Sequence, residues 1–252
     1  MLRLIICSLL LAAGHLHGQS ATKNLALEGA TSLHLSALFS DVAITTGSGD
    51  AVTVEHILLI DGKARPELTE LRVTRQGGVL MVEETKPTEQ QLKPEMQRGT
   101  TVINGHRVYG TNGLNIETRL IVTVPQGLPV SLETIYGNVD ITDLVKLKEV
   151  RATYGSVTVV YTDKALLPPA IDLYSNYGAV DLTLPPDTDT QVELTTEHGK
   201  LLTDFDIAID PDGSEHQNFF EQVAGTLGNP TTDGLLRCTA PYGKVYLRRG
   251  GG

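Results

Sequence analysis

The sequence predicts an all-β protein whose chain winds as a solenoid. From Leu25 onward, most of the chain alternates apolar and polar residues with a period of two, the pattern of half-buried strands. A short phrase also recurs with a period near 20 residues, which is typical of repeats that bury their apolar faces against one another. Helical periodicity is confined to Glu215 to Ala224. We therefore expect strands almost everywhere.

The first 18 residues have the parts of a secretory signal peptide. Arg3 supplies a positive charge, residues 4–13 form an apolar run, and Leu16-His17-Gly18 provides a small-residue exit. The run is too short for a stable membrane anchor, and Cys7 lies inside it, which does not fit a lipoprotein attachment site. We expect residues 19–252 to form one domain outside the cytoplasm, in the periplasm, on the cell surface or secreted.

The charge of the mature chain argues against nucleic-acid binding. Without Arg3, 19 basic residues stand against 30 acidic ones, a net charge of −11. An acidic surface repels nucleic acid, and no basic patch with interleaved aromatics offsets this. Cys238 is the only cysteine left after the signal peptide, so no internal disulfide is possible, and we expect it to be a small buried residue in a strand.

Strands and turns alternate through the first half of the chain. Val42 to Thr45 and Ala51 to His56 are expected strands around the turn Gly47 to Asp50. Gln76-Gly77-Gly78 separates two further strands and predicts a hairpin. Leu120 to Val124 is a more continuously apolar strand.

Two polar stretches interrupt this rhythm. Residues 86–118 contain Pro87, Pro94 and several glycines, and we interpret them as an insertion that carries a hairpin. Tyr109-Gly110 inside it mimics the repeated phrase, but no strand follows, so we expect a turn there. Residues 204–229 form the second expected insertion.

The repeated phrase is an aromatic residue, a glycine and an alternating strand. Its Tyr or His positions are 136, 154, 177, 198 and 242, with steps of 18, 23, 21 and 44 residues. The second insertion accounts for the double last step. Phe39-Ser40-Asp41-Val42 aligns with Tyr136-Gly137-Asn138-Val139 as a fainter copy. The predicted corner residues are Tyr136, Gly137, Tyr154, Gly155, Tyr177, Gly178, His198, Gly199, Tyr242 and Gly243.

A solenoid corner explains the form of the phrase. Glycine permits positive φ and close backbone approach at the corner. The aromatic residues of successive repeats would stack as a ladder, while the strand residues Val139, Val157, Val180, Leu201 and Val245 point inward. Residues 140, 158, 181, 202 and 246 would then face outward. We favour a structural role for the ladder, with a platform for sugar rings as the alternative, and we expect His198 to substitute for tyrosine rather than act as a ligand or base.

At this point the chain resembles a known family, the adhesin-like β-solenoid domain of unknown function found in secreted bacterial proteins. That family is related to the auto-transporter adhesin head domains. The motifs that carry the resemblance, besides the repeated phrases, are Asp41-Val42-Ala43-Ile44, Gly47-Ser48-Gly49-Asp50, Val52-Thr53-Val54, Val122-Thr123-Val124-Pro125 and Gly225-Thr226-Leu227-Gly228. The resemblance implies a single-stranded, right-handed β-helix in the envelope or beyond, with no established catalytic residues.

Candidate catalytic and metal sites are weak. Asp140 and Asp181 occupy the same outward position on rungs about 9–10 Å apart, near the upper end of the spacing of inverting glycosidases. No basic residue recurs beside them in the sequence. The acidic turns Asp210 to Glu215 and Asp187 to Asp189 lack the ligand spacing of an EF-hand calcium loop. We expect no catalytic residues, no resident metal and no cofactor.

The expected function is therefore an exported, non-enzymatic β-solenoid that binds or scaffolds a glycan or a cell-envelope protein. Two alternatives stay open. One is a polysaccharide-degrading β-helix that uses outward carboxylates, and the other is a purely structural module that assembles through its open ends.

Overall fold

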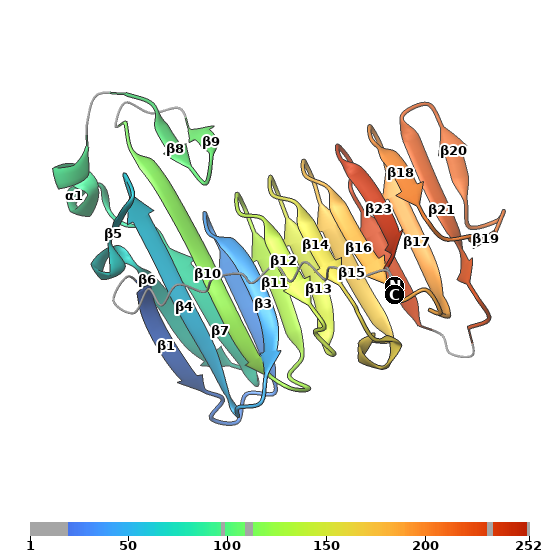
Figure 1. The fold of residues 1–252 in the computed structure, drawn as a ribbon, viewed down its shortest axis with the longest axis horizontal. Coiled ribbons are helices and arrows are strands. Elements are labelled where there is room, and N and C mark those ends of the chain that lie inside the picture. Colours follow the sequence, from blue (N-terminus) through green and yellow to red (C-terminus); the bar gives the residue numbers. More distant parts are fainter. Residues whose placement is uncertain (1–19, 97–98, 109–112, 231–233, 251–252) are drawn as a thin grey trace, which may run out of the picture.

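The structure, a computed structural model, describes residues 20–96, 99–108, 113–230 and 234–250. Two large sheets face each other, and the strands lie side by side along the length of the molecule (Figure 1). The all-β prediction is confirmed. The expected signal peptide and Tyr109-Gly110 lie outside the described residues.

The first sheet, here called sheet A, contains strands whose inward residues are mostly valine, leucine and isoleucine. Its members are β1 (Ser20–Ala26), β3 (Asp41–Gly47), β4 (Ala51–Ile60), β5 (Lys63–Ala64), β8 (Thr101–Ile103), β9 (His106–Val108), β10 (Asn115–Pro125), β12 (Val139–Thr142), β14 (Val157–Val160), β16 (Val180–Leu184), β18 (Lys200–Thr203) and β23 (Lys244–Arg249).

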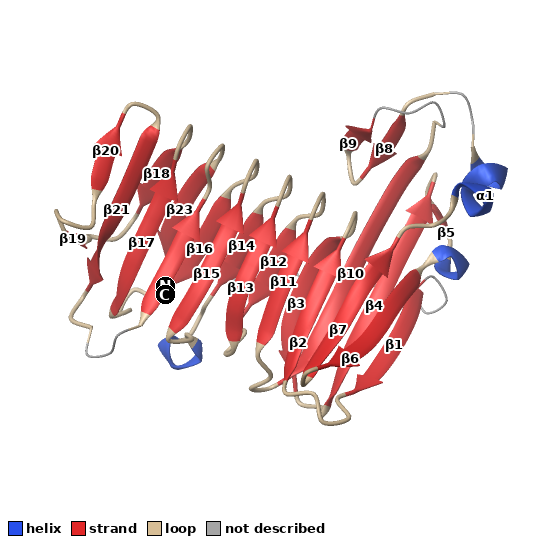
Figure 2. Cartoon of the chain, turned by 180° about the vertical axis from the view of Figure 1, so that it is seen from behind, coloured by secondary structure: helices blue, strands red, loops and turns tan. Residues whose placement is uncertain are grey.

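Sheet B forms the opposite layer. Its members are β2 (Ser32–Ala37), β6 (Glu70–Gln76), β7 (Val79–Thr85), β11 (Val130–Thr134), β13 (Leu147–Ala152), β15 (Ala170–Ser175), β17 (Thr190–Thr196), β19 (Ala208–Ile209), β20 (Glu215–Gln217), β21 (Phe220–Leu227) and β22 (Leu235–Thr239). The short helix α1 (Glu89–Leu92) and the 3-10 turns Pro66–Leu68, Lys93–Glu95 and Lys164–Leu166 lie between strands (Figure 2).

Consecutive strands in the middle of the chain alternate between the two sheets. We call such a pair a rung: a strand of sheet B, a turn, and the following strand of sheet A. Rungs stack with parallel pairing on both sides, as β11 pairs β13 and β12 pairs β14. The inward residues of both strands meet in one core, where Val139, Val157 and Val180 are fully buried. The sequence alternates apolar and polar residues because each sheet has one face in the core and one face in solvent.

The chain order of the rungs differs from their spatial order at one end. The rung β22–β23 pairs with β15 and β16 on one side and with β17 and β18 on the other. In Figure 1 the red turn of β22–β23 accordingly lies between two orange turns. The expected order, with Tyr242 last, is therefore wrong, because the final strands insert into the stack instead of extending it.

Antiparallel strands flank the parallel stack at both ends. Near the N-terminus, β4 pairs antiparallel with β1 and β10, and β6 pairs antiparallel with β7. Gly77 and Gly78 join β6 to β7 with φ of +60° and +80°, as a tight hairpin turn requires. At the other end, β21 pairs antiparallel with β17. Such end strands replace the missing neighbour rung.

The two polar stretches contribute strands to these ends. Residues 86–118 include α1 and the hairpin β8–β9, but β10 already begins at Asn115. Residues 204–229 supply β19, β20 and β21. The helical periodicity of Glu215 to Ala224 is overturned, because these residues form β20 and most of β21, paired antiparallel through Glu215 and Gln222. Sheet pairing has overridden the local pattern here.

Candidate functional site

An aromatic column runs along the rim where the rungs turn from sheet B into sheet A. It consists, in spatial order, of Phe39, Tyr136, Tyr154, Tyr177, Tyr242, His198 and Phe219. Neighbouring rings from Phe39 to His198 are stacked, with centroids 5.1–5.4 Å apart and interplanar angles of 8–17°. Phe219 ends the column at a tilt of 44°. The structure thus brings all five predicted ladder rings together and adds two phenylalanines.

The turn backbone sets this spacing. The amide of Tyr154 donates to the carbonyl of Ile135 at 2.8 Å, and the amide of Tyr177 donates to the carbonyl of Thr153 at 3.0 Å. Each ring is therefore held one strand spacing above the ring before it. The centroid separation of 5.1–5.4 Å is slightly larger than the roughly 4.8 Å between paired strands.

The glycine after each aromatic residue forms a second column beside the rings. A Cβ on Gly155 would overlap the carbonyl oxygen of Gly137, and one on Gly178 would overlap that of Gly155. The same overlap holds at the remaining glycines of the column, which are Gly137, Gly199 and Gly243. Positive φ is not the reason for these glycines, because none of them has it. Close backbone approach alone requires glycine here.

Hydroxyl side chains hydrogen-bond the backbone of three of these turns. Thr134, Ser175 and Thr196 are buried, and each accepts a hydrogen bond from the amide of the glycine three residues later, at 3.0–3.2 Å. Ser175 also donates to the carbonyl of Gly155 in the neighbouring rung at 2.7 Å. The hydroxyls were missed in the sequence, although a small or hydroxyl residue three positions before each glycine is a readable signal.

Ser40 occupies the glycine position of the first turn, where no rung precedes it. The amides of Leu38, Phe39 and Ser40 donate instead to Oε2 of Glu84, at 2.7, 3.0 and 3.1 Å. The Ser40 hydroxyl donates to Oε1 of Glu84 at 2.7 Å. The Glu84 carboxylate thus takes the place of the missing carbonyls and caps the turn column.

His56 and Thr118 complete this buried polar cluster. Thr118 Oγ1 lies 2.7 Å from Ser40 Oγ and 3.2 Å from His56 Nε2. Because Ser40 donates its one hydroxyl hydrogen to Glu84, Thr118 donates to Ser40, and His56 Nε2 donates to Thr118. Burial lowers the pKa of His56, an effect that the nearby Glu84 partly opposes. Ser40 is fully buried and its proton is committed to Glu84, so the cluster is arranged as a cap and not as an activated nucleophile.

The exposed part of the aromatic column is the row of tyrosine edges. Tyr136, Tyr154, Tyr177 and Tyr242 are 42–52% exposed. Their faces are covered by neighbouring rings, so solvent meets the ring edges and the phenol groups. None of the four hydroxyls bonds to another residue in the described ranges. Each therefore keeps its donor and acceptor capacity for a partner.

The outward residues of sheet A form a mixed row beside this rim. Asp140, Thr158, Asp181, Tyr246 and Leu202 are in register across neighbouring strands. Arg248 Nε shares its one hydrogen between the two carboxylate oxygens of Asp181, at 2.8 and 2.9 Å, and the Arg248 guanidinium also lies 4.5 Å from the centre of the Tyr246 ring. Burial raises the pKa of Asp140, opposed by Arg119. No basic residue recurs beside these aspartates in the sequence, but strand pairing brings Arg248 to Asp181 and Arg119 near Asp140 from distant parts of the chain.

The remaining candidates are occupied by structural contacts. Asp189 binds Lys164 and accepts the amide of Asn229 at 2.9 Å, which holds its pKa below the usual range. Asp210 accepts the amide of Asp212 at 3.1 Å. Cys238 is fully buried, and burial raises the pKa of its thiol.

Within the described ranges, no three His, Cys, Asp or Glu side chains are grouped as metal ligands. In the same residues, no helix has the length and apolar character to cross a membrane.

Comparisons with known proteins find likeness in fold. No family model matches the chain, and no curated protein matches it. The fold is similar to a solved structure named as a "putative cell adhesion protein" from Clostridium sporogenes, with a TM-score of 0.56 and 14% identity over 92% of this chain and 99% of that one. A "putative adhesin" from Bacteroides fragilis aligns with a TM-score of 0.30 and 8% identity over 92% of this chain and 98% of that one. The chain thus shares its fold with a protein that carries a cell-adhesion name.

Proposed function

We propose that this protein is an exported, adhesin-like binding protein that contacts its partner through the tyrosine edge of the aromatic column. The observation that carries the proposal is the row of four half-exposed tyrosines with unbonded hydroxyls. The cell-adhesion name of the similar structure agrees with a binding role.

The geometry of the rim favours an extended partner. Ring centroids of Tyr136, Tyr154 and Tyr177 repeat at 5.2 Å, so one phenol follows another along the rim at a regular spacing. Because the ring faces are stacked on one another, a sugar ring cannot lie flat on the inner tyrosines. A glycan chain or an extended segment of an envelope protein can instead run along the row and exchange hydrogen bonds with successive hydroxyls. Glycan and envelope protein are the partner classes that we propose.

The outer face of sheet B is a weaker candidate surface. Its charged side chains already pair with one another, as Arg237 does with Glu193 at 3.1 Å and Arg151 with Asp172 at 3.6 Å. A partner would have to break these contacts. The outward row of sheet A borders the tyrosine edge and is the natural extension of the contact surface.

The proposed architecture is a single-stranded β-solenoid. Rungs that alternate between two parallel walls support winding of one chain, although β22–β23 inserts out of order. We propose a right-handed coil, because parallel crossover connections are almost always right-handed. The predicted signal peptide over residues 1–18 supports a location outside the cytoplasm.

We also propose that the protein is not an enzyme. The alternative, glycan cleavage by Asp140 and Asp181, is weakened by the commitment of Asp181 to Arg248. Cleavage predicts release of oligosaccharides that Asp140→Asn or Asp181→Asn abolishes without lowering the melting temperature. Absence of any released product from envelope polysaccharides supports the binding role.

A pull-down from the native cell envelope tests the proposed function. Purified residues 19–252 are expected to retain an envelope glycan or protein, and fractionation is expected to place the native protein outside the cytoplasm. No retention on any envelope or polysaccharide fraction would count against an adhesin-like role and favour a purely structural one.

A further inference from the structure

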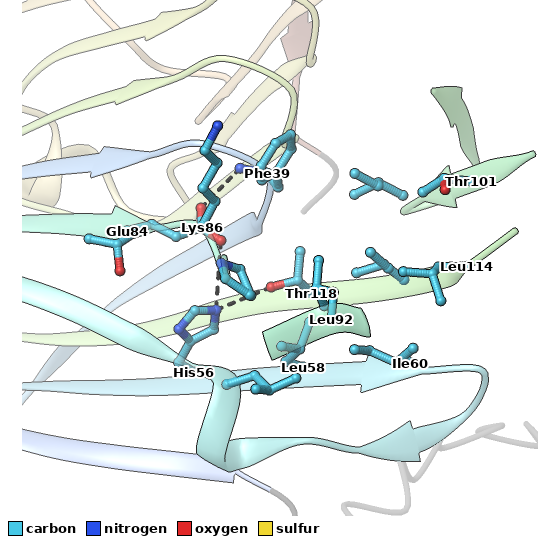
Figure 3. A pocket seen from close by; sticks show the side chains of 15 residues that line it. Phe39, His56, Leu58, Ile60, Glu84, Lys86, Leu92, Thr101, Leu114 and Thr118 are labelled. Atoms are coloured by element: carbon cyan, nitrogen blue, oxygen red, sulfur yellow. Dashed lines mark hydrogen bonds and ion pairs between the residues drawn. The ribbon is translucent and has the colours of Figure 1, made fainter. Parts of the chain in front are cut away.

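A partly enclosed cavity of about 190 Å³ lies at the end of the aromatic column, apart from the tyrosine edge. It forms where β4 and β10 extend beyond the end of β7, so their inward residues face α1 instead of sheet B, while β8, which pairs with β10 in sheet A, adds Thr101 and Ile103 to the lining. Figure 3 shows its lining side chains. The core of the two sheets is therefore not closed at this end.

Most of the lining is apolar. Leu58, Ile60 and Leu114 are buried and form a small cluster of their own, separate from the main core, with Leu92 of α1 packed against it. Phe39 also lines the cavity, while it stacks on Tyr136 at 5.4 Å. The first ring of the column thus forms part of the cavity wall.

Lys86 adds a solvent-exposed positive charge to the lining of the cavity. It has no hydrogen bond or ion pair with another residue that the structure describes. In Figure 3, Lys86 lies beside Phe39, away from Leu114 and Ile60. Glu84 also borders the space, but its oxygens accept three amides and the Ser40 hydroxyl. Of these two charged side chains, Lys86 is therefore the one without a bonded partner among the described residues.

We infer that this cavity binds a small hydrophobic anion, such as a short aliphatic or aryl carboxylate. Engineered apolar cavities of about 150 Å³ stay dry and bind benzene, so a space of this size accepts an apolar group slightly larger than one ring. The apolar part occupies the space between Leu58, Ile60 and Leu114. The carboxylate lies near Lys86, where it compensates the ammonium group.

The test uses hexanoate and its neutral counterpart 1-hexanol, with residues 19–252 as the protein and affinity measured by titration calorimetry. The wild type is expected to bind both, hexanoate more tightly. Lys86→Gln is expected to weaken hexanoate binding about fivefold at low salt and to leave 1-hexanol unchanged. Lys93→Gln, an exposed lysine nearby that does not line the cavity, is expected to change neither.

Two variants that fill the cavity separate binding from folding. Leu114→Phe and, on the short helix, Leu92→Phe are expected to abolish binding of both probes while the melting temperature stays at or above that of the wild type. No binding of either probe to the wild type overturns the inference, and so does unchanged binding in a folded filling variant. Equal loss of hexanoate affinity in Lys86→Gln and Lys93→Gln overturns the assignment of Lys86 as the anion partner.

Discussion

The ring of Tyr242 stacks directly on that of Tyr177, with centroids 5.1 Å apart and an interplanar angle of 16°. His198 follows Tyr177 sooner in the chain, yet its ring stacks on the far side of Tyr242. The last strands of the chain therefore place Tyr242 inside the column, between Tyr177 and His198.

Substitution of a column glycine tests whether close backbone approach holds the rungs together. Gly155→Ala places a Cβ against the carbonyl of Gly137, and the stack must separate locally to admit it. We expect a loss of about 1–3 kcal/mol in the free energy of unfolding, measured by urea denaturation. The control is Gly49→Ala, where a Cβ meets nothing within 4 Å. Equal effects of the two substitutions would refute the backbone contact as the reason for glycine.

Glu84→Gln tests the cap of the first turn. The amide keeps the shape of the carboxylate, but it removes the charge that three backbone amides and Ser40 bond. We expect a loss of about 2–3 kcal/mol in the free energy of unfolding. Glu83→Gln next to it, an exposed residue paired with Arg72, is expected to cost less than about 1 kcal/mol. Equal losses of unfolding free energy in Glu84→Gln and Glu83→Gln would show that the cap does not stabilise the fold.

The stability of the protein is expected to fall in mild acid through His56. Burial lowers its pKa in the folded state below the ordinary 6.5, so the unfolded chain binds a proton that the folded protein resists. The contribution is complete above pH 6.5 and is lost as the pH falls from there toward the folded pKa. The urea midpoint, measured between pH 5 and 8 (roughly the range in which histidine titrates), should drop less steeply below pH 6.5 in His56→Gln. The same slope in both proteins would contradict this assignment.

Removal of one inner ring tests the energy of the aromatic column. Tyr154→Ala deletes two stacked contacts, those with Tyr136 and Tyr177. We expect a loss of roughly 1–3 kcal/mol beyond the area effect, from thermal or urea unfolding. Tyr154→Phe keeps both contacts and should retain most of the wild-type stability. A large loss in Tyr154→Phe would show that the hydroxyl, and not the ring, stabilises the fold.

The repeated part of the fold could be predicted from the sequence, but the ends of the stack could not. The rungs of Tyr136, Tyr154 and Tyr177 follow one another both along the chain and in space. The sequence repeat therefore predicts correctly which rings are neighbours. Tyr242 does not follow this pattern. The pairing of β23 with β16 places it beside Tyr177, and no local feature of the sequence indicates that pairing. The helical period of Glu215 to Ala224 failed for the same reason, since pairing with β17 decides the conformation of β21.

The partners of the charged residues depend equally on spatial order. Arg248 reaches Asp181 only because β23 lies beside β16. The Glu84 cap follows from the absence of a rung before Ser40, which the serine in a glycine position indicates only in hindsight. The cavity arises from unequal strand lengths at one end, a property of the assembled sheets and not of any motif.

The central claim is that the tyrosine hydroxyls form the contact surface, and replacement of all four by phenylalanine tests it most directly. The variant with phenylalanine at positions 136, 154, 177 and 242 keeps the stacked rings and loses the hydrogen-bonding groups. The measurement is retention of native envelope fractions by this variant and by the wild type, at matched melting temperatures. The account predicts at least about a tenfold loss of affinity, equivalent to 1.4 kcal/mol. Undiminished retention by the folded variant would contradict it.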